Sequence, residues 1–378
     1  MKISILFVID NLQFGGGERV FSQLINCLAP ERYRIFLASL PGDNFYKTIQ
    51  NKHVKFFHLD FSRRFNPFLI FQLKKIIKKN QIMIVHGQGT RSEFYARMAH
   101  RYAGTSVYIS TIAMPVEGFD VGSKRKMLYR FLDRLSERWV DRFIVVSDEL
   151  RNRLIRNRGL PPDKVTRIYN GIEIDRYSGE GTEAYRNKIR HELNIDNGSY
   201  LIGAVGRLVW QKGFEHLISA MPGVLKIHPD ARLIIAGEGP LEQRLRTLCS
   251  ELKVNDKIIF AGFRDDVRKI LSAVDVLAVP SIREGFPMIT LEGMAMEKPI
   301  IASDISGITE QISDNETGII VPPQDPGALA DAIIKLKPGT PFTKTLALNA
   351  RKKVESDFSV TGMVYETEKI YQSLINKE

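Results

Sequence analysis

The chain has 378 residues, 44% of them hydrophobic and 26% charged, a composition typical of a globular protein rather than a disordered or fibrous one. Its length predicts two domains, since one domain usually has about 150 residues. Two cysteines, Cys27 and Cys249, are too few for a disulfide framework and favour a cytoplasmic location. The longest uncharged stretch, 102–116, is too short and polar to cross a bilayer, and residues 1–10 are typical of a buried strand rather than a signal peptide.

The positive charge is concentrated in the first half of the chain. Residues 1–180 carry a net charge of +13 and the remainder −2, which gives +11 overall. This asymmetry favours an anionic partner for the first half, such as a membrane surface or a phosphorylated acceptor, with a generic solubility charge as the alternative. We expect no nucleic-acid partner, because the basic residues are not interleaved with a recognisable binding module.

The first half contains separate basic clusters, and aromatic residues lie near the first of them. Cations beside exposed aromatic residues would suit a peripheral contact with anionic lipid. The alternative is that the aromatic residues pack into the domain while the cations stay solvated. The clusters are Arg63-Arg64, Lys74-Lys75, Lys78-Lys79 and Lys124-Arg125-Lys126, and the aromatic residues are Phe61, Phe65 and Phe68.

Short runs of Ile, Val and Leu alternate with amphipathic stretches along the chain. We expect strands at 3–9, 34–39, 54–58, 82–86, 107–111 and 143–147, and then at 201–206, 232–236, 257–260, 276–279, 299–302 and 318–321. Apolar strands separated by helices are typical of parallel sheets covered on both faces, so the predicted fold class is α/β with two Rossmann-like, doubly wound domains. We expect an N-terminal domain over 1–175, a linker with a small helix over 176–198, a second domain over 199–357 and a C-terminal helix over 358–378.

The first loop with chemical meaning follows the first predicted strand. Gly15, Gly16 and Gly17 open a helix there, so the backbone can approach a ligand and the N–H groups of the helix start can attract an anion. It is not the dinucleotide fingerprint, because Val20 stands where the last glycine would be, and no P-loop lysine follows. A tight strand–helix turn is the alternative interpretation.

Residues 206–213 place two cations, Arg207 and Lys212, between a predicted strand and a predicted helix. Arg offers a planar fork of donors and Lys a mobile point charge, and the two together suit a diphosphate. An exposed loop with ordinary surface cations is the alternative.

The most informative segment is 283–293. It places Glu284 in a loop, Gly285, Phe286 and Pro287 at the approach to a helix, and Glu292 in the first turns of that helix. Carboxylates can accept two hydrogen bonds from a sugar or ribose diol, while the N–H groups of a helix start bind phosphate oxygens. The alternative is a loop acid followed by an acid that favours the helix dipole.

These segments together resemble the retaining GT-B glycosyltransferases of family 4 (glycosyltransferase group 1). The E-x7-E element of the family matches Glu284 and Glu292, and its G-R-L-x-x-x-K-G element matches 206–213. Its glycine loop matches 15–18, its I-Y-N-G-I-[DE] element 168–173, and its F-x-G-[FY] strand end 260–263. The resemblance covers nearly the whole chain and implies two domains that face each other across a cleft.

The resemblance also implies a role for each candidate. Glu292 would hold the ribose hydroxyls, Glu284 the hydroxyls of the donor sugar, and Arg207 and Lys212 the diphosphate. The other donor-binding positions would be Phe263 and Arg264 beside the base, Gly16 and Gly17 over the phosphates, and Gly285, Phe286 and Pro287 between the two acids. No metal and no cofactor are expected, because Arg and Lys supply the positive charge.

The implied reaction is transfer of a sugar from a nucleotide-sugar donor to a lipid-linked or saccharide acceptor, with retention of anomeric configuration. A UDP-sugar is favoured over a GDP-sugar because UDP donors are commoner. Two other functions stay open: a nucleotide-sugar epimerase, which would need acid–base residues near the sugar ring, and a catalytically weak partner protein that binds nucleotide sugars.

One position departs from the family. Many members carry a His within Ser-Thr-x-His, usually assigned to contacts with the transferred sugar, where this chain has Ala113. His86, which ends an earlier predicted strand, is another candidate for the cleft, with a satisfied, partly buried His as the alternative. A milder departure is Ser306-Gly307, which replaces Gly-Gly ahead of Glu310.

Overall fold

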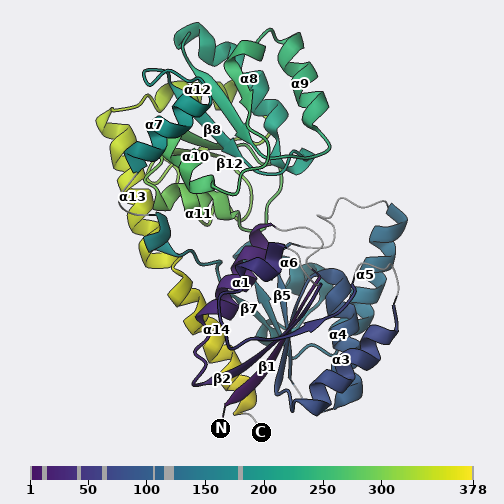
Figure 1. The fold of residues 1–378 in the computed structure, drawn as a ribbon. Coiled ribbons are helices and arrows are strands. Elements are labelled where there is room, and N and C mark those ends of the chain that lie inside the picture. Colours follow the sequence, from purple (N-terminus) through teal and green to yellow (C-terminus); the bar gives the residue numbers. More distant parts are fainter. Residues whose placement is uncertain are drawn as a thin grey trace. The chain divides into compact units, whose positions relative to one another are not determined.

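A computed structural model describes residues 2–10, 15–40, 44–61, 66–104, 107–114, 123–177 and 182–376. The chain forms two compact units: unit 1 comprises 1–171 and 360–378, and unit 2 comprises 172–359 (Figure 1). Each unit contains one parallel sheet covered by helices on both faces, so the predicted fold class is confirmed. No helix within the described part of the chain is long and apolar enough to cross a membrane.

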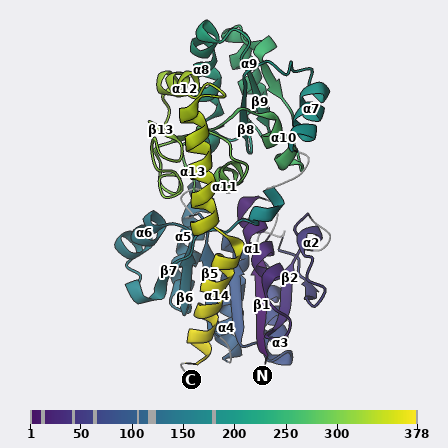
Figure 2. The ribbon, with the colours of Figure 1, turned by 90° about the vertical axis from the view of Figure 1, so that its left-hand side faces the viewer.

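The sheet of unit 1 has seven strands in the order β3-β2-β1-β4-β5-β6-β7. Alternate residues of β1 face opposite sides, and Ile5, Phe7 and Ile9 pack against α1 and α14 in one hydrophobic core. Figure 1 shows α3, α4 and α5 along one side of this sheet, and Figure 2 shows α14 crossing the other. Its strands are β1 Ile3–Ile9, β2 Tyr33–Ser39, β3 Lys55–His58, β4 Ile84–Gln88, β5 Val107–Ile112, β6 Arg142–Val145 and β7 Val165–Arg167. Its helices are α1 Gly16–Cys27, α2 Asn44–Thr48, α3 Phe68–Lys79, α4 Thr90–Ala103, α5 Ser123–Glu137, α6 Asp148–Arg158 and α14 Val360–Ile375, with a 3-10 turn at Pro162–Lys164.

The sheet of unit 2 has six strands in the order β10-β9-β8-β11-β12-β13. Residues of α8, α9 and α12 form one hydrophobic core with alternate strand residues such as Ile202 and Ala204. Its strands are β8 Leu201–Val205, β9 Arg232–Ala236, β10 Ile258–Phe260, β11 Val276–Val279, β12 Ile300–Ser303 and β13 Ile319–Val321. Its helices are α7 Thr182–Glu192, α8 Phe214–Ile227, α9 Glu242–Glu251, α10 Val267–Ala273, α11 Met288–Ala295, α12 Pro326–Lys335 and α13 Pro341–Asp357, with 3-10 turns at Ile174–Tyr177, Trp210–Lys212 and Asn255–Lys257.

All twelve predicted strands are present, with ends shifted by up to two residues, and one strand was missed. The missed strand, β7, has only three residues, pairs with β6 alone and carries no apolar run. Edge strands this short and polar give no periodic signal that sequence analysis can detect.

The division into units differs from the predicted one at both ends of the second domain. The segment 176–198, expected to be a linker, belongs to unit 2, because Arg190 of α7 is fully buried there and bonded to Asp275 and to the carbonyl of Ala273. The predicted C-terminal helix is confirmed as α14 and packs in unit 1 through Met363 and Tyr371.

Candidate active site

In each unit the strand order identifies where a ligand would bind. In unit 2, β9 and β10 are added on one side of β8, and the following strands β11, β12 and β13 are added on its other side. β8 therefore lies between β9 and β11. A crevice forms beyond the carboxyl ends of two such neighbouring strands, and ligands of doubly wound sheets bind in it. In unit 2 this point lies between the ends of β8 and β11, which are followed by Arg207 and Ser281 respectively.

The loop 206–213 bends back toward the end of β11. Gly213 has a φ of 61°, and a Cβ there would lie 2.2 Å from the carbonyl oxygen of Pro280. The amide of Ile282 also donates to the carbonyl of Gln211 at 2.7 Å. This close approach requires a glycine at 213 and brings the end of the loop against the segment that contains Glu284.

Lys212 and Glu284 form an ion pair at this point, with 2.6 Å between Nζ and Oε1. The hydroxyl of Ser281 also donates to Oε1 at 2.7 Å. The carboxylate is 8% exposed and the lysine 22%, so the pair is partly shielded from water. Sequence analysis assigned Lys212 and Glu284 to separate ligand groups and placed Ser281 at a strand end without giving it a role. The structure brings all three side chains together.

Arg207 lies two residues after the end of β8 and is exposed to solvent. Within the part of the chain that the structure describes, its guanidinium has no hydrogen-bond or ion-pair partner. Its donors are therefore available to an anion, in contrast with the ammonium of Lys212.

The helix α11 begins at Met288 after Pro287, in agreement with the predicted helix start. Glu292 lies on its second turn and is 2% exposed. Its Oε1 accepts a hydrogen bond from the hydroxyl of Tyr177 at 3.0 Å. Tyr177 was missed, because it lies 115 residues away in sequence and no motif connects the two.

Gly285 and Gly307 explain one of the departures from the family pattern. Gly307 has a φ of 81°, and a Cβ on it would lie 2.1 Å from the carbonyl oxygen of Gly285. The second glycine of the family's pair is therefore required here, whereas the exposed Ser306 occupies the first position. Phe286, the next residue along, is buried and packs edge-on against Phe358.

Phe263 and Arg264 follow β10, two strands from the Lys212–Glu284 pair. Phe263 is 62% exposed, as a platform for a base would be, and its amide donates to Glu238 at 3.2 Å. Arg264 is held by Asp266 at 2.8 Å and Glu192 at 2.6 Å, and these hydrogen bonds raise the pKa of its guanidinium. The guanidinium of Arg264 thus connects α7 to the start of α10.

Gly16 and Gly17 belong to unit 1, where they open α1 at the corresponding switch point between β1 and β4. A Cβ on Gly17 would lie 3.0 Å from Nε2 of Gln88 and 3.7 Å from the Cβ of Ala113. Ala113, the position at which family members often carry a His, therefore lies beside the glycine turn. Residues 11–14, which include Phe14, lie outside the described part of the chain.

Asp10 at the end of β1 is a further polar group at this switch point that sequence analysis did not select. It accepts a hydrogen bond from Ser92 at 3.3 Å, and burial raises the pKa of its carboxyl to about 6. Its place directly after the first strand was the signal that could have identified it.

His86 does not contribute to the switch point between β1 and β4. Its Nδ1 lies 2.6 Å from the hydroxyl of Tyr371, its Nε2 lies 2.7 Å from that of Thr111, and the ring is fully buried. Burial lowers the pKa of the imidazole to about 3. The interpretation of His86 as a satisfied histidine is confirmed.

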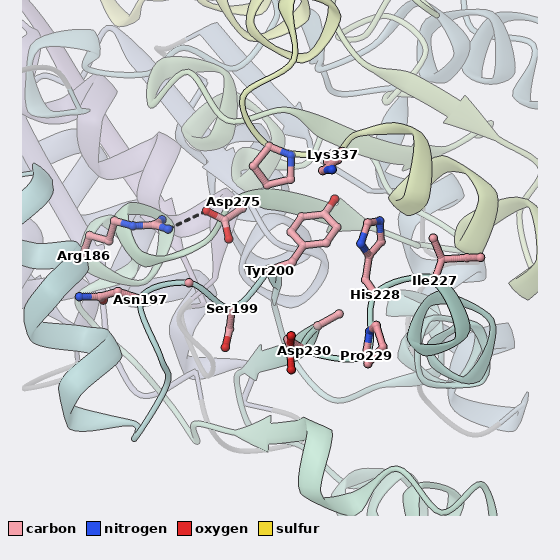
Figure 3. A pocket seen from close by; sticks show the side chains of 13 residues that line it. Arg186, Asn197, Ser199, Tyr200, Ile227, His228, Pro229, Asp230, Asp275 and Lys337 are labelled. Atoms are coloured by element: carbon pink, nitrogen blue, oxygen red, sulfur yellow. Dashed lines mark hydrogen bonds and ion pairs between the residues drawn. The ribbon is translucent and has the colours of Figure 1, made fainter.

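A cavity of about 400 Å³ lies at the amino ends of strands in the unit 2 sheet, away from the carboxyl ends that carry the predicted site residues (Figure 3). Tyr200 and Asp275, which line it, precede β8 and β11 and so lie at the amino ends of these strands. Two of the charged groups that line it, Arg186 and Asp275, pair with each other at 2.8 Å (Figure 3). None of the predicted site residues lines this cavity.

Comparison with known proteins places the chain in a family. Residues 14–176 match the family model described as Glycosyltransferase Family 4, and residues 185–353 match that of Glycosyl transferases group 1. The putative glycosyltransferase EpsD of Bacillus subtilis is 30% identical over 316 residues, which cover 81% of each chain. The uncharacterized glycosyltransferase MJ1607 of Methanocaldococcus jannaschii is 33% identical over 231 residues, 61% of this chain and 59% of that protein. The UDP-Gal:alpha-D-GlcNAc-diphosphoundecaprenol alpha-1,3-galactosyltransferase of Escherichia coli is 24% identical over 314 residues, 81% of this chain and 79% of that protein.

Solved structures show the same fold. Anabaena Alr3699/HepE in complex with UDP aligns with a TM-score of 0.81 at 21% identity, over 99% of this chain and 100% of that one. A glycosyltransferase from Rickettsia africae ESF-5 aligns with a TM-score of 0.82 at 24% identity, over the full length of both chains. With its two parallel-sheet domains and its matches along the whole length, the chain belongs to the group 1 glycosyltransferases, which have the GT-B fold.

Proposed function

We propose that the protein is a retaining glycosyltransferase that moves a sugar from a nucleotide-sugar donor to a lipid-linked or saccharide acceptor. The observation that carries this proposal is the set of groups at the switch point of unit 2. These are the unpaired guanidinium of Arg207, the Lys212–Glu284 ion pair and the buried carboxylate of Glu292. A diphosphate needs cations, and a ribose or sugar diol needs carboxylate acceptors.

In this mechanism the diphosphate of the donor binds Arg207 and attracts the ammonium of Lys212. Glu284 then shares or loses its lysine partner and can accept hydrogen bonds from the donor sugar. Glu292, held by Tyr177, accepts hydrogen bonds from the ribose hydroxyls. The N–H groups of the first turn of α11 add donors for the phosphate oxygens.

In the chemical step, the bond between the anomeric carbon and the diphosphate oxygen breaks, and a bond to the acceptor oxygen forms on the same face of the sugar. The leaving phosphate oxygen takes the proton of the acceptor hydroxyl. The protein contributes mainly by stabilising the negative charge that develops on the diphosphate. We propose that Arg207 and Lys212 do this without a bound metal ion or cofactor.

Two similar proteins support the choice of a UDP-sugar over a GDP-sugar. The HepE structure contains UDP, and the E. coli relative is named for UDP-Gal and for an acceptor on diphosphoundecaprenol. A capsular polysaccharide biosynthesis glycosyltransferase of Staphylococcus aureus is also similar, at 25% identity over 262 residues. We propose a role in polysaccharide biosynthesis, in the cytoplasm at the inner face of the membrane.

A thermal-shift panel of nucleotides and nucleotide sugars, followed by incubation with the stabilising donor, tests this proposal. A ligand at ~100 times its dissociation constant should stabilise the protein by about 2.7 kcal/mol. Release of nucleoside diphosphate together with a glycosylated acceptor supports transfer. A changed sugar without acceptor would identify an epimerase, and binding without any turnover would identify a regulatory partner protein, for which Ala113 in place of the family's His is the motivating observation.

A further inference from the structure

The helix α5 in unit 1 exposes three large apolar side chains. Met127 is 70% exposed, Phe131 64% and Leu135 42%. These residues are four positions apart, so they form one stripe along the helix. Helices on the surface of a globular domain usually turn such a stripe toward the core. The stripe of α5 faces the solvent instead.

The polar face of α5 is buried instead. Asp133 is 8% exposed and accepts from Arg97 at 2.7 Å and from Arg158 at 2.5 Å. Glu137, one turn further, pairs with the same Arg158. Arg97 is 1% exposed and also binds Glu93 of α4 at 3.0 Å, so the pairs form one buried network.

This network fixes the rotation of α5 about its axis. Turning the apolar stripe inward would break the pairs of Asp133 and Glu137 and take one carboxylate partner, Asp133, away from the buried Arg97, which is unfavourable. The apolar stripe is therefore held outward by the fold. Contiguous apolar surface that is held outward in this way is typical of an interaction site.

The charges around the stripe indicate the partner. Both acidic residues of α5 are buried, while Arg134 and Arg138 at its end are exposed. The sequence also contains Lys124, Arg125, Lys126 and Arg130 in this helix, whose side chains are outside the described part of the structure. Exposed cations beside an apolar stripe attract anionic lipid headgroups and repel a second copy of the same surface.

The neighbouring helix α3 has a similar composition. Phe68 is 73% exposed and Phe71 67%, and Lys75, Lys78 and Lys79 are exposed on the following turns. α4 contacts both helices, and Figure 1 shows the three along one side of the unit 1 sheet. Of the aromatic residues expected from the sequence at this contact, Phe68 is exposed and Phe61 is fully buried. Arg63, Arg64 and Phe65 lie outside the described residues.

We propose that the outward stripe of α5 inserts into the headgroup region of an anionic membrane, with the exposed cations of α5 and α3 on the surrounding phosphates. This rests on the proposed function, since a lipid-linked acceptor would be reached from such a surface. The stripe gives the contact an apolar component in addition to the electrostatic one.

Co-sedimentation with phosphatidylcholine vesicles, with and without about a third of phosphatidylglycerol, tests the proposal. We expect binding to the anionic vesicles only, weakening as the salt concentration rises. The variant Met127→Ser/Phe131→Ser/Leu135→Ser should lower the partition coefficient at least about tenfold, as expected from the apolar area it removes. The matched control Leu348→Ser removes a 50% exposed apolar side chain from α13 of unit 2 and should bind as the unaltered protein does.

Several other outcomes would overturn the proposal. Absence of binding to anionic vesicles at low salt, or equal binding by the triple variant and the control, would reject α5 as the contact. A dimer in light scattering that the triple variant abolishes would assign the stripe to a second copy.

Nucleotide-induced thermal shifts measured on the same samples separate the two proposals. Normal shifts without vesicle binding reject only the membrane contact, and vesicle binding without shifts rejects only the proposed function. Melting temperatures no lower than that of the control variant confirm that the triple variant is folded.

Discussion

At the scale of single residues, the two cations of the loop 206–213 are in different states. Lys212 is already neutralised by Glu284, whereas Arg207 has no partner among the residues described. A bound diphosphate would therefore gain a full charge-assisted interaction from Arg207, but from Lys212 only the difference between phosphate and carboxylate. Arg207 should accordingly contribute more to donor binding than Lys212.

Replacement of Arg207 tests its contribution to donor binding. We expect Arg207→Ala to lower donor kcat/KM by ~10–150-fold, since loss of a hydrogen bond to a charged group costs roughly 1.5–3 kcal/mol. The melting temperature should not change, because the side chain is exposed and unpaired. Steady-state kinetics with the variant Arg244→Ala, an exposed arginine of α9, provide the matched control. Unchanged donor kinetics for Arg207→Ala would contradict donor binding at the carboxyl ends of the unit 2 strands.

His86 gives a second prediction, on stability against pH. Its pKa is about 3 in the folded chain against 6.5 for the free side chain, because burial of the ring among Phe7, Phe21 and Tyr371 disfavours its charged form. A lowered folded-state pKa means that the stabilisation is complete above pH ~6.5 and is lost as the pH falls toward 3, by about 1.4 kcal/mol per pH unit.

Chemical denaturation at several pH values measures this effect. The difference in unfolding free energy between the unaltered protein and His86→Gln should shrink as the pH is lowered from 7 to 4. Taking the difference cancels the opposite effect of Asp10, whose raised pKa gives stability that is lost as the pH rises through 6. A difference that stays constant over this range would show that His86 is hydrated or already charged.

At the scale of elements, α7 shows how one buried side chain joins a helix to a sheet. Besides Ala273 and Asp275, the guanidinium of Arg190 donates to the carbonyls of Asp196, Asn197 and Ser199, all at 2.9–3.0 Å. These carbonyls belong to the turn that leads into β8. Arg190 thus ties α7 and the start of β8 to the end of α10, far from the carboxyl edge that holds the motif residues.

We expect Arg190→Met to destabilise unit 2 by roughly 3–5 kcal/mol, because it leaves Asp275 without one partner and several buried carbonyls without donors. Urea unfolding measures the loss. Lys188→Met, on the exposed side of the same helix, should change the unfolding free energy by less than about 0.5 kcal/mol. Equal effects of the two substitutions would mean that α7 is not held by its buried arginine.

At the scale of the whole molecule, the proposed reaction depends on positive charge supplied by side chains and a helix start. Arg207, Lys212 and the first turn of α11 all lie at the carboxyl edge of the unit 2 sheet. An enzyme that stabilises a leaving diphosphate in this way does not depend on a divalent cation for that charge.

Chelation tests this account on the full chain. We expect transfer activity to remain within about twofold after treatment with EDTA, measured as nucleoside diphosphate released in the presence of acceptor. A Ca²⁺-saturated EDTA sample controls for effects of the chelator itself. Loss of turnover that only Mg²⁺ or Mn²⁺ restores would contradict the Arg/Lys mechanism.

The sequence by itself determined the fold class, twelve of the thirteen strands found in the described residues, and the loops in which the charged residues of the site lie. It could do so because apolar periodicity, glycine positions and helix starts are local properties of the chain. Glu284 and Glu292, for example, could be placed before and within α11 from the position of Pro287 alone.

Only the tertiary structure decided which of these side chains pair and which face they present. The contacts of Glu292 with Tyr177, of Lys212 with Glu284 and of Asp133 with Arg97 connect residues 115, 72 and 36 positions apart. The outward stripe of α5 follows from the last of these contacts, because its apolar spacing alone predicts a buried face. Such pairings depend on which elements the sheet order brings together, and that order is set by packing across the whole unit rather than by any local segment.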